Sequence, residues 1–172
     1  MNVQEVFIDG ITQLFDWMDE ALDGLSAEQL NHLPPGKSVS IGFNAWHISR
    51  TADNLTNFAL QRKQPLWIAE GYVERMGLPK VDQGTGMGLD DARAITINDP
   101  ALLRTYARAV EKDVVAFLTA VPDAVLAEVQ MVKPLGEMPK WRVFRQVVMT
   151  HGFMHLGEIN AVRGQMGLQF SI

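Results

Sequence analysis

The sequence predicts an all-α protein, a four-helix bundle with a long connection between the second and third helices. Three observations support this fold class. Apolar residues recur at helical spacing in four stretches of roughly 20 residues, no segment has a convincing strand-like alternation, and residues 62–98 interrupt the helical pattern. A chain of 172 residues that is 47% hydrophobic and 20% charged has the size and composition of one globular domain. We therefore expect a single domain over residues 1–172.

The first long helix is predicted over residues 2–24. Its apolar stripe recurs every three or four residues, with acidic residues between the members: Val3, Phe7, Ile11, Leu14, Met18 and Leu22. Ser26 and Gln29 then match a capping box, in which each side chain bonds the backbone N–H of the other residue. A short helical segment is therefore expected to begin after Ser26 and to end before Pro34.

The second long helix is predicted from about Ser40 to just before Pro65, where helical spacing returns. Residues 62–98 form the long connection. A compact domain seldom keeps so long a segment without local structure, so we expect short helical turns that fold over one end of the bundle. The glycines of residues 84–88 do not indicate nucleotide binding, because no apolar strand precedes them and no Lys-Ser or Lys-Thr pair follows. A mobile loop is expected there.

The third helix is predicted to begin after Asp99, which can cap it, with Pro100 at the first helical position, where no backbone N–H is needed. Its spacing continues to Val121. Residues 123–132 in the following link are predicted as either a short helix or an extended piece. The fourth helix spans about 140–166 and ends at Gly167, a good left-handed C-terminal cap.

Composition excludes several classes of function. The net charge of −5, from 15 basic and 20 acidic residues, argues against a nucleic-acid partner. The chain has no cysteine, so it lacks disulfides, thiolate metal ligands and a thiol nucleophile of its own. No signal peptide is recognisable, and no apolar run approaches the roughly 20 residues that cross a bilayer. We therefore expect a cytoplasmic protein with no membrane contact.

Two of the four histidines stand four residues apart on the predicted core-facing stripe of the fourth helix. His151 and His155 therefore share one helical face, and their imidazoles can converge on one ion. His47 lies beside the apolar stripe of the second helix, from which it can meet them across the bundle. Spacing alone leaves two explanations open: histidines satisfied by hydrogen bonds, or a metal site made by His47, His151 and His155. His32, next to a double proline, is expected to be exposed.

Other side chains of the fourth helix constrain the chemistry. A zinc-protease helix needs Glu directly after its first histidine, and Gly152 occupies that position. Glu158 lies on the same face as the histidines, where it can orient an imidazole, act on a bound water, or be a solvated or Arg-paired carboxylate. Three arginines can bind a substrate carboxylate, although ordinary surface pairing is favoured for them: Arg142, Arg145 and Arg163.

The combination of "NAWHISR" on the second helix and "HGFMHLGEINAVRGQMGL" on the fourth resembles the DinB-like family. The matching positions are His47, His151, His155, Gly157, Glu158, Ile159 and the Gln-Met-Gly-Leu ending. The resemblance implies a DinB-like four-helix bundle over the whole chain. It also implies a divalent ion, usually nickel or zinc, held by the three histidines with the remaining positions open. Several relatives use a low-molecular-weight thiol as a cosubstrate, which fits a chain without cysteine.

The functional hypothesis is a divalent-metal-dependent enzyme that acts on a small molecule, as a thiol-dependent S-transferase or isomerase, or as a hydrolase. The alternative is a non-catalytic helical bundle that binds a metal or a ligand and takes part in a stress response. The bundle also permits a homodimer, as in many relatives that the chain resembles. The sequence names neither the metal, the thiol nor the substrate, and catalytic residues beyond the metal ligands stay open.

Overall fold

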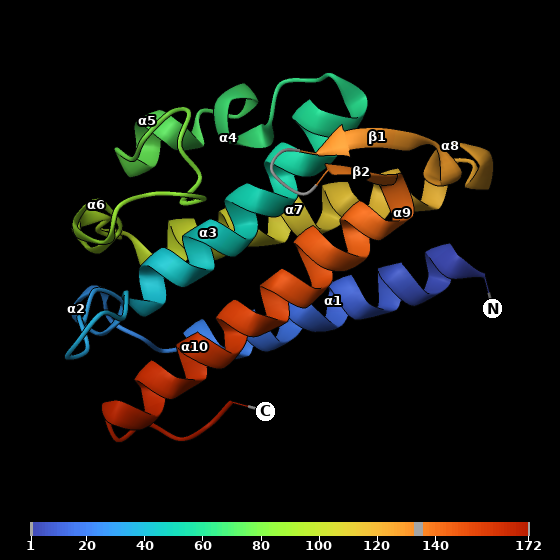
Figure 1. Ribbon diagram of the computed structural model, residues 1–172. Helices are drawn as coiled ribbons and strands as arrows, with labels where there is room; N and C mark the ends of the chain where they lie inside the picture. The colour runs from blue at the N-terminus through green and yellow to red at the C-terminus, as the bar shows by residue number, and fades with distance from the viewer. Residues whose placement is uncertain (1, 133–135, 172) are drawn as a thin grey trace.

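The computed structural model describes residues 2–132 and 136–171, and most of these residues are helical. In this described part, the long helical segments make four rods (Figure 1). They are α1 (Val3–Leu22), α3 (Ile41–Asp53) continued by η1 (Asn54–Leu60), α7 (Pro100–Ala120), and the last rod of α9 (Lys140–Val143), η2 (Phe144–Thr150) and α10 (His151–Gln165). The elements η1 and η2 are π-helical turns inside otherwise α-helical rods.

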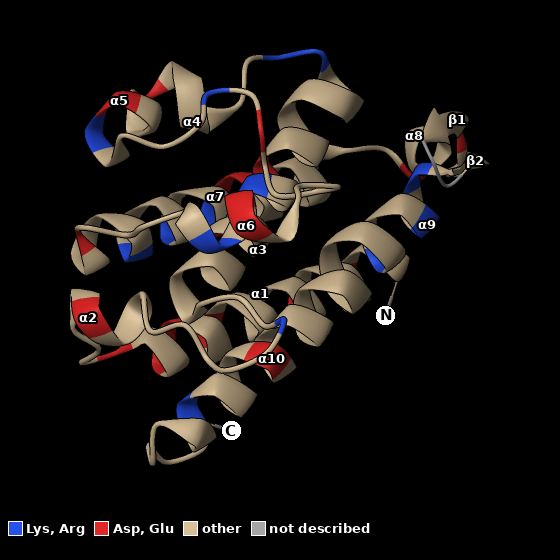
Figure 2. Ribbon diagram, turned by 60° about the vertical axis from the view of Figure 1, so that its left-hand side comes forward, with Lys and Arg blue, Asp and Glu red and all other residues tan. Residues whose placement is uncertain are grey.

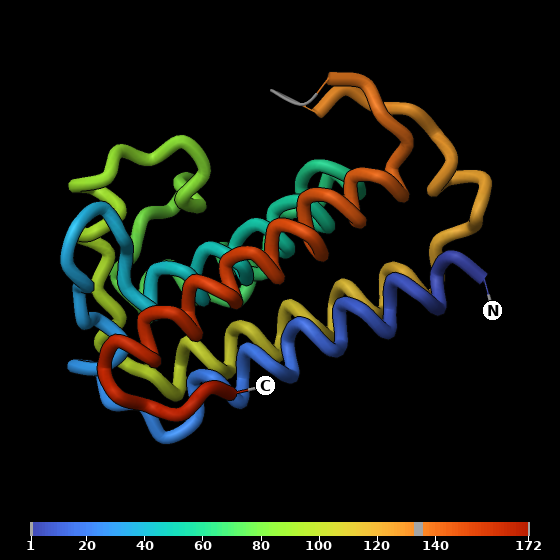
Figure 3. Tube along the Cα trace, turned by 60° about the horizontal axis from the view of Figure 1, so that its bottom comes forward, coloured from blue at the N-terminus to red at the C-terminus, as the bar shows by residue number. Residues whose placement is uncertain are grey.

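The rods pack in a ring: α1 on α7, α7 on α3, α3 on α10, and α10 on α1. Figure 3 shows the two layers that result, with α3 and α10 side by side above α1 and α7. Each rod contributes fully buried side chains to the common core, among them Leu14, Trp46, Tyr106 and Phe144. Burial of this apolar surface is the main favourable term in folding.

Gly152 allows α10 to lie close to α1. A Cβ at this position would collide with the side chain of Leu14. A glutamate after the first histidine of α10 would therefore have to displace the side chain of Leu14 or the helix itself. The chain thus departs from the zinc-protease pattern for a reason of packing as well as of chemistry.

The predicted helix starts and stops agree with the structure. Ser26 and Gln29 form the capping box that opens α2 (Ala27–Leu30), with bonds of 2.9 and 3.2 Å. Asp99 accepts a hydrogen bond from the backbone N–H of Leu102 at 2.9 Å and caps α7. Gly167 has a φ of 73°, the left-handed conformation expected beyond the last helix.

The long connection contains the short helices α4 (Leu66–Ala69), α5 (Tyr72–Met76) and α6 (Leu89–Ala94). Together with α2 they cover one end of the four rods, as Figure 1 shows in green and light blue. The expectation of short helical turns at one end is therefore confirmed. Trp67 of α4 is fully buried against Trp46 and Tyr106, which anchors the connection to the core.

The all-α expectation fits the described residues broadly, but the link after α7 adds a small two-stranded sheet. Residues 123–132 form both of the predicted alternatives: α8 (Asp123–Ala127), then β1 (Val129–Val132). The strand β2 (Gly136–Pro139) pairs with β1 in antiparallel register, Val129 opposite Pro139 and Val132 opposite Gly136. Strands of four residues are too short to give a readable alternation. In the views of Figures 1 and 3 the hairpin lies at the opposite end from α5 and α6.

A fully buried carboxylate ties α3 to the long connection. Asp53 accepts hydrogen bonds from the backbone N–H groups of Leu66 and Trp67, both at 2.9 Å, and from the hydroxyl of Tyr106 at 2.8 Å. The buried guanidinium of Arg50 lies 4.0 Å from Asp53 and stacks over the ring of Trp67 at 5.0 Å. These polar contacts fix where the connection leaves the α3 rod.

Charged residues are interspersed over the rods. Figure 2 shows acidic and basic segments on most of the long helices, with neither sign confined to one face of the ribbon. The best-defined ion pairs join α7 to α1, where Arg104 and Arg108 contact Asp19 at 2.6 and 3.0 Å. None of the helices formed by residues 2–132 and 136–171 is both long enough and apolar enough to span a bilayer.

Candidate metal centre

His47 is held on α3, the rod that begins at the cap residue Ser40. Its side chain faces α10, and only 4% of the residue is exposed. The ring of Phe43, one turn earlier, stacks on the imidazole with centroids 5.7 Å apart. The predicted position of His47, beside the apolar stripe and facing a neighbouring helix, therefore matches the structure.

His151 and His155 occupy the first two turns of α10 and are half-buried. The prediction that both histidines lie on the core-facing stripe of this rod is only partly correct. Phe144, Val148 and Val162 are buried, but Met154 is 67% exposed and Leu156 and Ile159 lie in the core instead. The two histidines consequently lie at the border between the core and the groove that separates α10 from α3.

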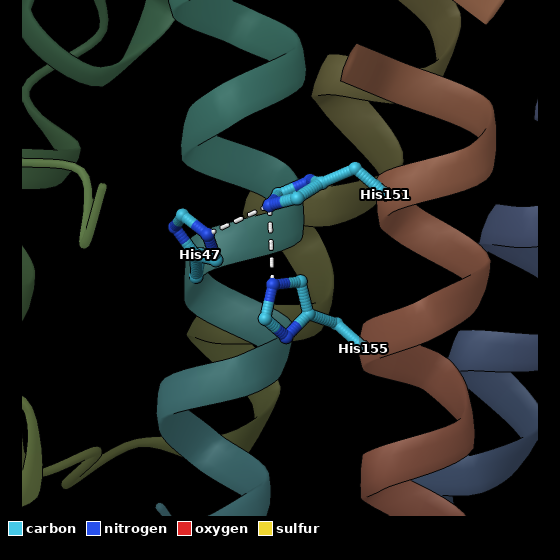
Figure 4. Close-up of side chains that lie close together, drawn as sticks. All are labelled: His47, His151 and His155. Carbon is cyan, nitrogen blue, oxygen red and sulfur yellow. Dashed lines mark hydrogen bonds between the residues drawn. The ribbon is translucent and has the colours of Figure 1, made fainter. Parts of the chain in front are cut away.

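The three imidazoles meet between the two rods (Figure 4). Nε2 of His151 lies 3.0 Å from Nε2 of His47 and 3.1 Å from Nε2 of His155. One nitrogen from each ring falls within 4.8 Å of the other two. His32 is exposed and takes no part, as expected.

The other ring nitrogen of each histidine faces an acceptor. Nδ1 of His47 contacts the backbone carbonyl of Gln83, and Nδ1 of His155 lies 2.8 Å from Glu158 and 3.0 Å from the amide oxygen of Asn44. His151 bonds the backbone carbonyl of Val147, one turn earlier. Since a neutral imidazole carries one proton, these acceptors place it on Nδ1 and leave each Nε2 as a bare lone pair.

Burial keeps the central imidazoles neutral at ordinary pH. Loss of hydration lowers the pKa of His151 to about 4, with a further contribution from the neighbouring histidines. Burial also lowers the pKa of His47. The hydrogen bond from His155 lowers the pKa of Glu158, so this acceptor is a carboxylate. Neutral imidazole is the form that binds metals.

Three converging lone pairs repel one another unless a cation lies between them. Imidazole nitrogens bind zinc at about 2.0–2.1 Å, so nitrogens that share one ion lie roughly 3.0–3.4 Å apart, as the two separations at His151 do. Acceptors that hold the far nitrogens are also typical of metal-bound histidines. The residues present therefore fit a divalent ion, and imidazole donors suit zinc, copper, iron and nickel alike.

Comparison with known proteins agrees with this geometry. The family model described as the DinB superfamily matches residues 11–159, a range that contains all three histidines. The chain belongs to the DinB superfamily. The predicted family resemblance is confirmed, and the three-histidine cluster of this DinB-superfamily chain is consistent with a metal-binding protein.

Similarity beyond the family model concerns the fold. A crystal structure of a conserved protein from Enterococcus faecalis superposes with a TM-score of 0.85 over 97% of this chain and 99% of that chain, at 20% sequence identity. At that identity the likeness shows a shared fold alone. No curated protein sequence matches the chain.

A cavity of about 850 Å³ opens beside the histidines. Its walls come from α3 and η1, η2 and α10, strand β1, and the loop of Gln83 and Thr85. The apolar lining residues are Leu55, Phe58, Ala59, Met131, Val132, Val147 and Met154, and His151 is the one residue of the cluster that reaches this wall. A cavity of this size and polarity suits a small organic molecule.

Both π-helical turns border this cavity. Asn54, Leu55 and Phe58 belong to η1, while Gln146, Val147 and Thr150 belong to η2. A π-turn adds one residue to a helical turn and is frequent at functional sites. Neither turn was predictable from the sequence, because helical periodicity tolerates a single added residue.

Glu158 lies on the far side of the cluster from the cavity. It borders a different, smaller hollow with Lys37 and Asn44, and its side chain is 55% exposed. Of the three roles considered for Glu158, the structure supports the orientation of an imidazole. The hydrogen bond to His155 takes the place of an arginine partner.

The three arginines considered as carboxylate ligands lie outside the site. None of Arg142, Arg145 and Arg163 lines the cavity, and Arg163 instead bonds backbone carbonyls such as that of Gln169.

Two residues of the site were not predicted from the sequence, Gln83 and Gly84. The loop expected to be mobile in fact holds His47 through the carbonyl of Gln83. Gly84 packs directly on His47, where a Cβ would lie 2.6 Å from Nδ1. The glycine-rich sequence of residues 84–88 was the only sign that this loop is special. It did not reveal that Gly84 packs against an imidazole.

Proposed function

We propose that His47, His151 and His155 bind one divalent ion, nickel or zinc, and that this DinB-superfamily protein is a metal-dependent enzyme acting on a small molecule in the adjoining cavity. The observation that carries the proposal is the convergence of three bare Nε2 atoms beside a cavity of about 850 Å³, whose wall His151 reaches. Three protein ligands with a further position open to substrate are typical of catalytic zinc sites. The proposal takes residues 1–172 as one four-helix-bundle domain.

The bound ion would supply a Lewis acid that lowers the pKa of a thiol or a water molecule. The chain's own residues have the supporting roles. Gln83 and Glu158 keep the protons of His47 and His155 on Nδ1, so that both Nε2 atoms stay available. Phe58, Met131 and Met154 would exclude water around the apolar part of the ligand.

The reaction class that we favour is thiol transfer. The chain has no cysteine, so a thiolate must arrive on a cosubstrate. Its sulfur would form a bond to an electrophilic carbon, the leaving group would depart with the electron pair of the broken bond, and the thiol proton would go to solvent. An isomerase would return the thiol after rearrangement, and a hydrolase would use water in place of the thiol.

Zinc or nickel should raise the melting temperature of metal-free protein. At a free-ion concentration about 100 times the Kd, binding adds about 2.7 kcal/mol, which corresponds to a shift of roughly 5–10 °C for a chain of this size. Scanning calorimetry of tag-free protein with and without each ion measures the shift. Magnesium, which prefers oxygen ligands, is the control ion and should have little effect. Equal shifts with magnesium, or none with zinc or nickel, would contradict the proposal.

Gly84→Ala should weaken metal binding by about 10- to 100-fold, the usual effect of disturbing a group that orients a metal ligand. The added Cβ would press on Nδ1 of His47 at 2.6 Å. Gly86→Ala is a matched control: Gly86 also has a positive φ, 75° against 96°, but nothing lies within 4 Å of its would-be Cβ. Titration of zinc against a chromophoric chelator gives both affinities. Equal losses would assign the effect to backbone strain instead of to His47.

The thiol part of the proposal has a spectroscopic test. Cobalt(II) bound at the three histidines would develop a sulfur-to-cobalt charge-transfer absorption when a thiolate joins it. A titration of cobalt-loaded protein with common cellular thiols, followed by a conjugation assay with reactive electrophiles, measures binding and turnover separately. Cobalt binding without any thiol signal would favour the hydrolase or the non-catalytic alternative.

A further inference from the structure

Arg62 brings a positive charge to the cavity. Among the described residues that line it, Arg62 is the one that carries a full charge, since His151 is neutral and the rest are polar or apolar. The protein carries a net charge of −5, whereas the one charged side chain among the described lining residues is a cation. A lone guanidinium in a mostly apolar cavity is suited to one anionic group, because it offers several donors in a planar fork.

The backbone at Arg62 is strained. Its φ is 59°, a left-handed conformation that, in the described part of the chain, no other residue except glycine adopts. Two hydrogen bonds hold the turn around it: the N–H of Lys63 donates to the carbonyl of Asn57 at 2.9 Å, and the side chain of Gln61 donates to the carbonyl of Thr56 at 3.2 Å. Such conformations cost about 1–3 kcal/mol and concentrate at functional sites. The turn therefore presents the Arg62 side chain from a fixed base.

The guanidinium of Arg62 has no ion-pair or hydrogen-bond partner within residues 2–132 and 136–171. Arg104 and Arg108 instead pair with Asp19, and Arg93 donates to the carbonyl oxygens of Gly36 and Ser38 at 2.9 Å. Two exposed arginines, Arg142 and Arg145, also have no partner among the described residues, but they do not line the cavity. The donors of Arg62 are therefore available to a ligand, and the described lining residues include no competing carboxylate.

The cavity is elongated along the α3–η1 rod. The lining residues of this rod recur on one helical stripe, at Thr51, Asn54 and Leu55, Phe58 and Ala59, and then Arg62. Arg62 stands eleven positions after Thr51, a span of at most about 16 Å at α-helical rise. Thr51 lies 3.5 Å from Nδ1 of His47 and so at the histidine end of the cavity. Arg62 follows the end of η1, which lies toward the hairpin (Figure 1).

Exposed apolar side chains lie between the two ends. Phe58 is 55% exposed, Met131 58% and Met154 67%, and all three line this cavity. Apolar surface that remains in water and borders a cavity is typical of a ligand site. The lining thus changes along the cavity from a metal-ligand imidazole, through an apolar middle, to a single cation.

We propose that Arg62 binds a carboxylate at the far end of the ligand, so that this protein acts on an elongated, mainly apolar molecule with one anionic terminus and a reacting group at the other. A single guanidinium and a net negative protein favour a monoanion over a polyphosphate. This inference rests on the proposed function for its reacting end. The carboxylate belongs either to the thiol cosubstrate or to the molecule that it attacks.

The test compares carboxylated probes with neutral probes of the same length. Octanoate should bind the metal-free protein about tenfold more tightly than 1-octanol in isothermal titration calorimetry, the effect of one charge-assisted hydrogen bond. Arg62→Gln should abolish the difference and Arg62→Lys should keep part of it. Arg142→Gln is the control, since Arg142 is exposed and, among the described residues, unpaired like Arg62 but lies outside the cavity. Equal affinities for octanoate and octanol, or a preference that survives in Arg62→Gln, would overturn the proposal.

Arg62→Gly guards against a purely structural explanation. Glycine adopts a positive φ without strain, so this variant should melt no lower than the natural protein and still lose the carboxylate preference. A melting temperature that falls markedly together with the preference would assign Arg62 to the fold instead of the ligand. Because these measurements use metal-free protein, their failure is separate from failure of metal binding.

Cobalt-loaded protein identifies the source of the carboxylate. If 8-mercaptooctanoate gives the sulfur-to-cobalt signal about tenfold more readily than 8-mercapto-1-octanol, and Arg62→Gln removes that advantage, Arg62 binds the thiol cosubstrate. If octanoate binds without displacing a cobalt-bound neutral thiol, Arg62 binds the other substrate. Either result supports a carboxylate at Arg62. Octanoate affinity that is unchanged by Arg62→Gln in this form would overturn it.

Discussion

His151→Ala is expected to reduce the affinity for zinc or nickel by more than about 100-fold. The Nε2 of His151 is the central atom of the cluster, 3.0 Å from His47 and 3.1 Å from His155. Disturbing a group that only orients a metal ligand costs about 10- to 100-fold, so loss of a ligand itself should cost more. Metal analysis of tag-free protein should fall from about one ion per chain to near zero after dialysis.

His32→Ala is the matched control for this variant. His32 is exposed in the link after α2 and lies outside the cluster, so its loss should leave the metal content unchanged. Circular dichroism should report the same helical content for both variants, because His151 is only half-buried. A His151→Ala protein that keeps one tightly bound ion would remove the basis of the proposed metal centre.

Asp53→Ala is expected to lower the free energy of unfolding by about 3–5 kcal/mol, the usual cost of breaking a buried charge pair from one side. Asp53 is fully buried and accepts from Leu66, Trp67 and Tyr106, beside the buried guanidinium of Arg50. Its removal leaves all of these groups without their acceptor. Urea denaturation followed by tryptophan fluorescence measures the change, since Trp67 lies in this cluster.

Two further variants separate charge from packing at Asp53. Asp53→Asn keeps an acceptor oxygen and should lose less stability, and adding Arg50→Met to it should recover part of the loss, because no unpaired guanidinium then remains buried. Asp9→Ala, on the exposed face of α1, should change stability by less than about 0.5 kcal/mol. An Asp53→Ala protein within about 1 kcal/mol of the natural one would mean that Arg50 and the backbone of α4 do not depend on this carboxylate.

Most of the helical structure was predictable because it follows from local rules. Periodicity located the four rods, and the side chains of Ser26 and Asp99 marked starts that the structure confirms. The hairpin was missed because each strand has four residues and is stabilised by pairing, which a local pattern does not encode. The π-turns were missed because one added residue barely changes the period.

The histidines of the candidate metal centre were predictable from the sequence, but the groups that hold them in place were not. His47, His151 and His155 could be named from helical faces and from the family resemblance, and the structure brings them together. The acceptor for His47 is the backbone carbonyl of Gln83, and because every residue has such a carbonyl, the sequence does not show which one is used. Arg62 was equally hidden, because a left-handed backbone at an arginine depends on hydrogen bonds around the turn that its own identity does not specify.

The separation of the histidines along the chain has a consequence for biosynthesis. His47 and His151 are 104 positions apart. During translation, His47 can therefore meet His151 only after the last rod has been made and has packed against α3. A nascent chain that ends before His151 therefore offers an ion at most one imidazole of the three. In the proposed metalloprotein, the complete three-histidine site forms only after the last rod has been made, so cellular metal supply would act on the folded domain.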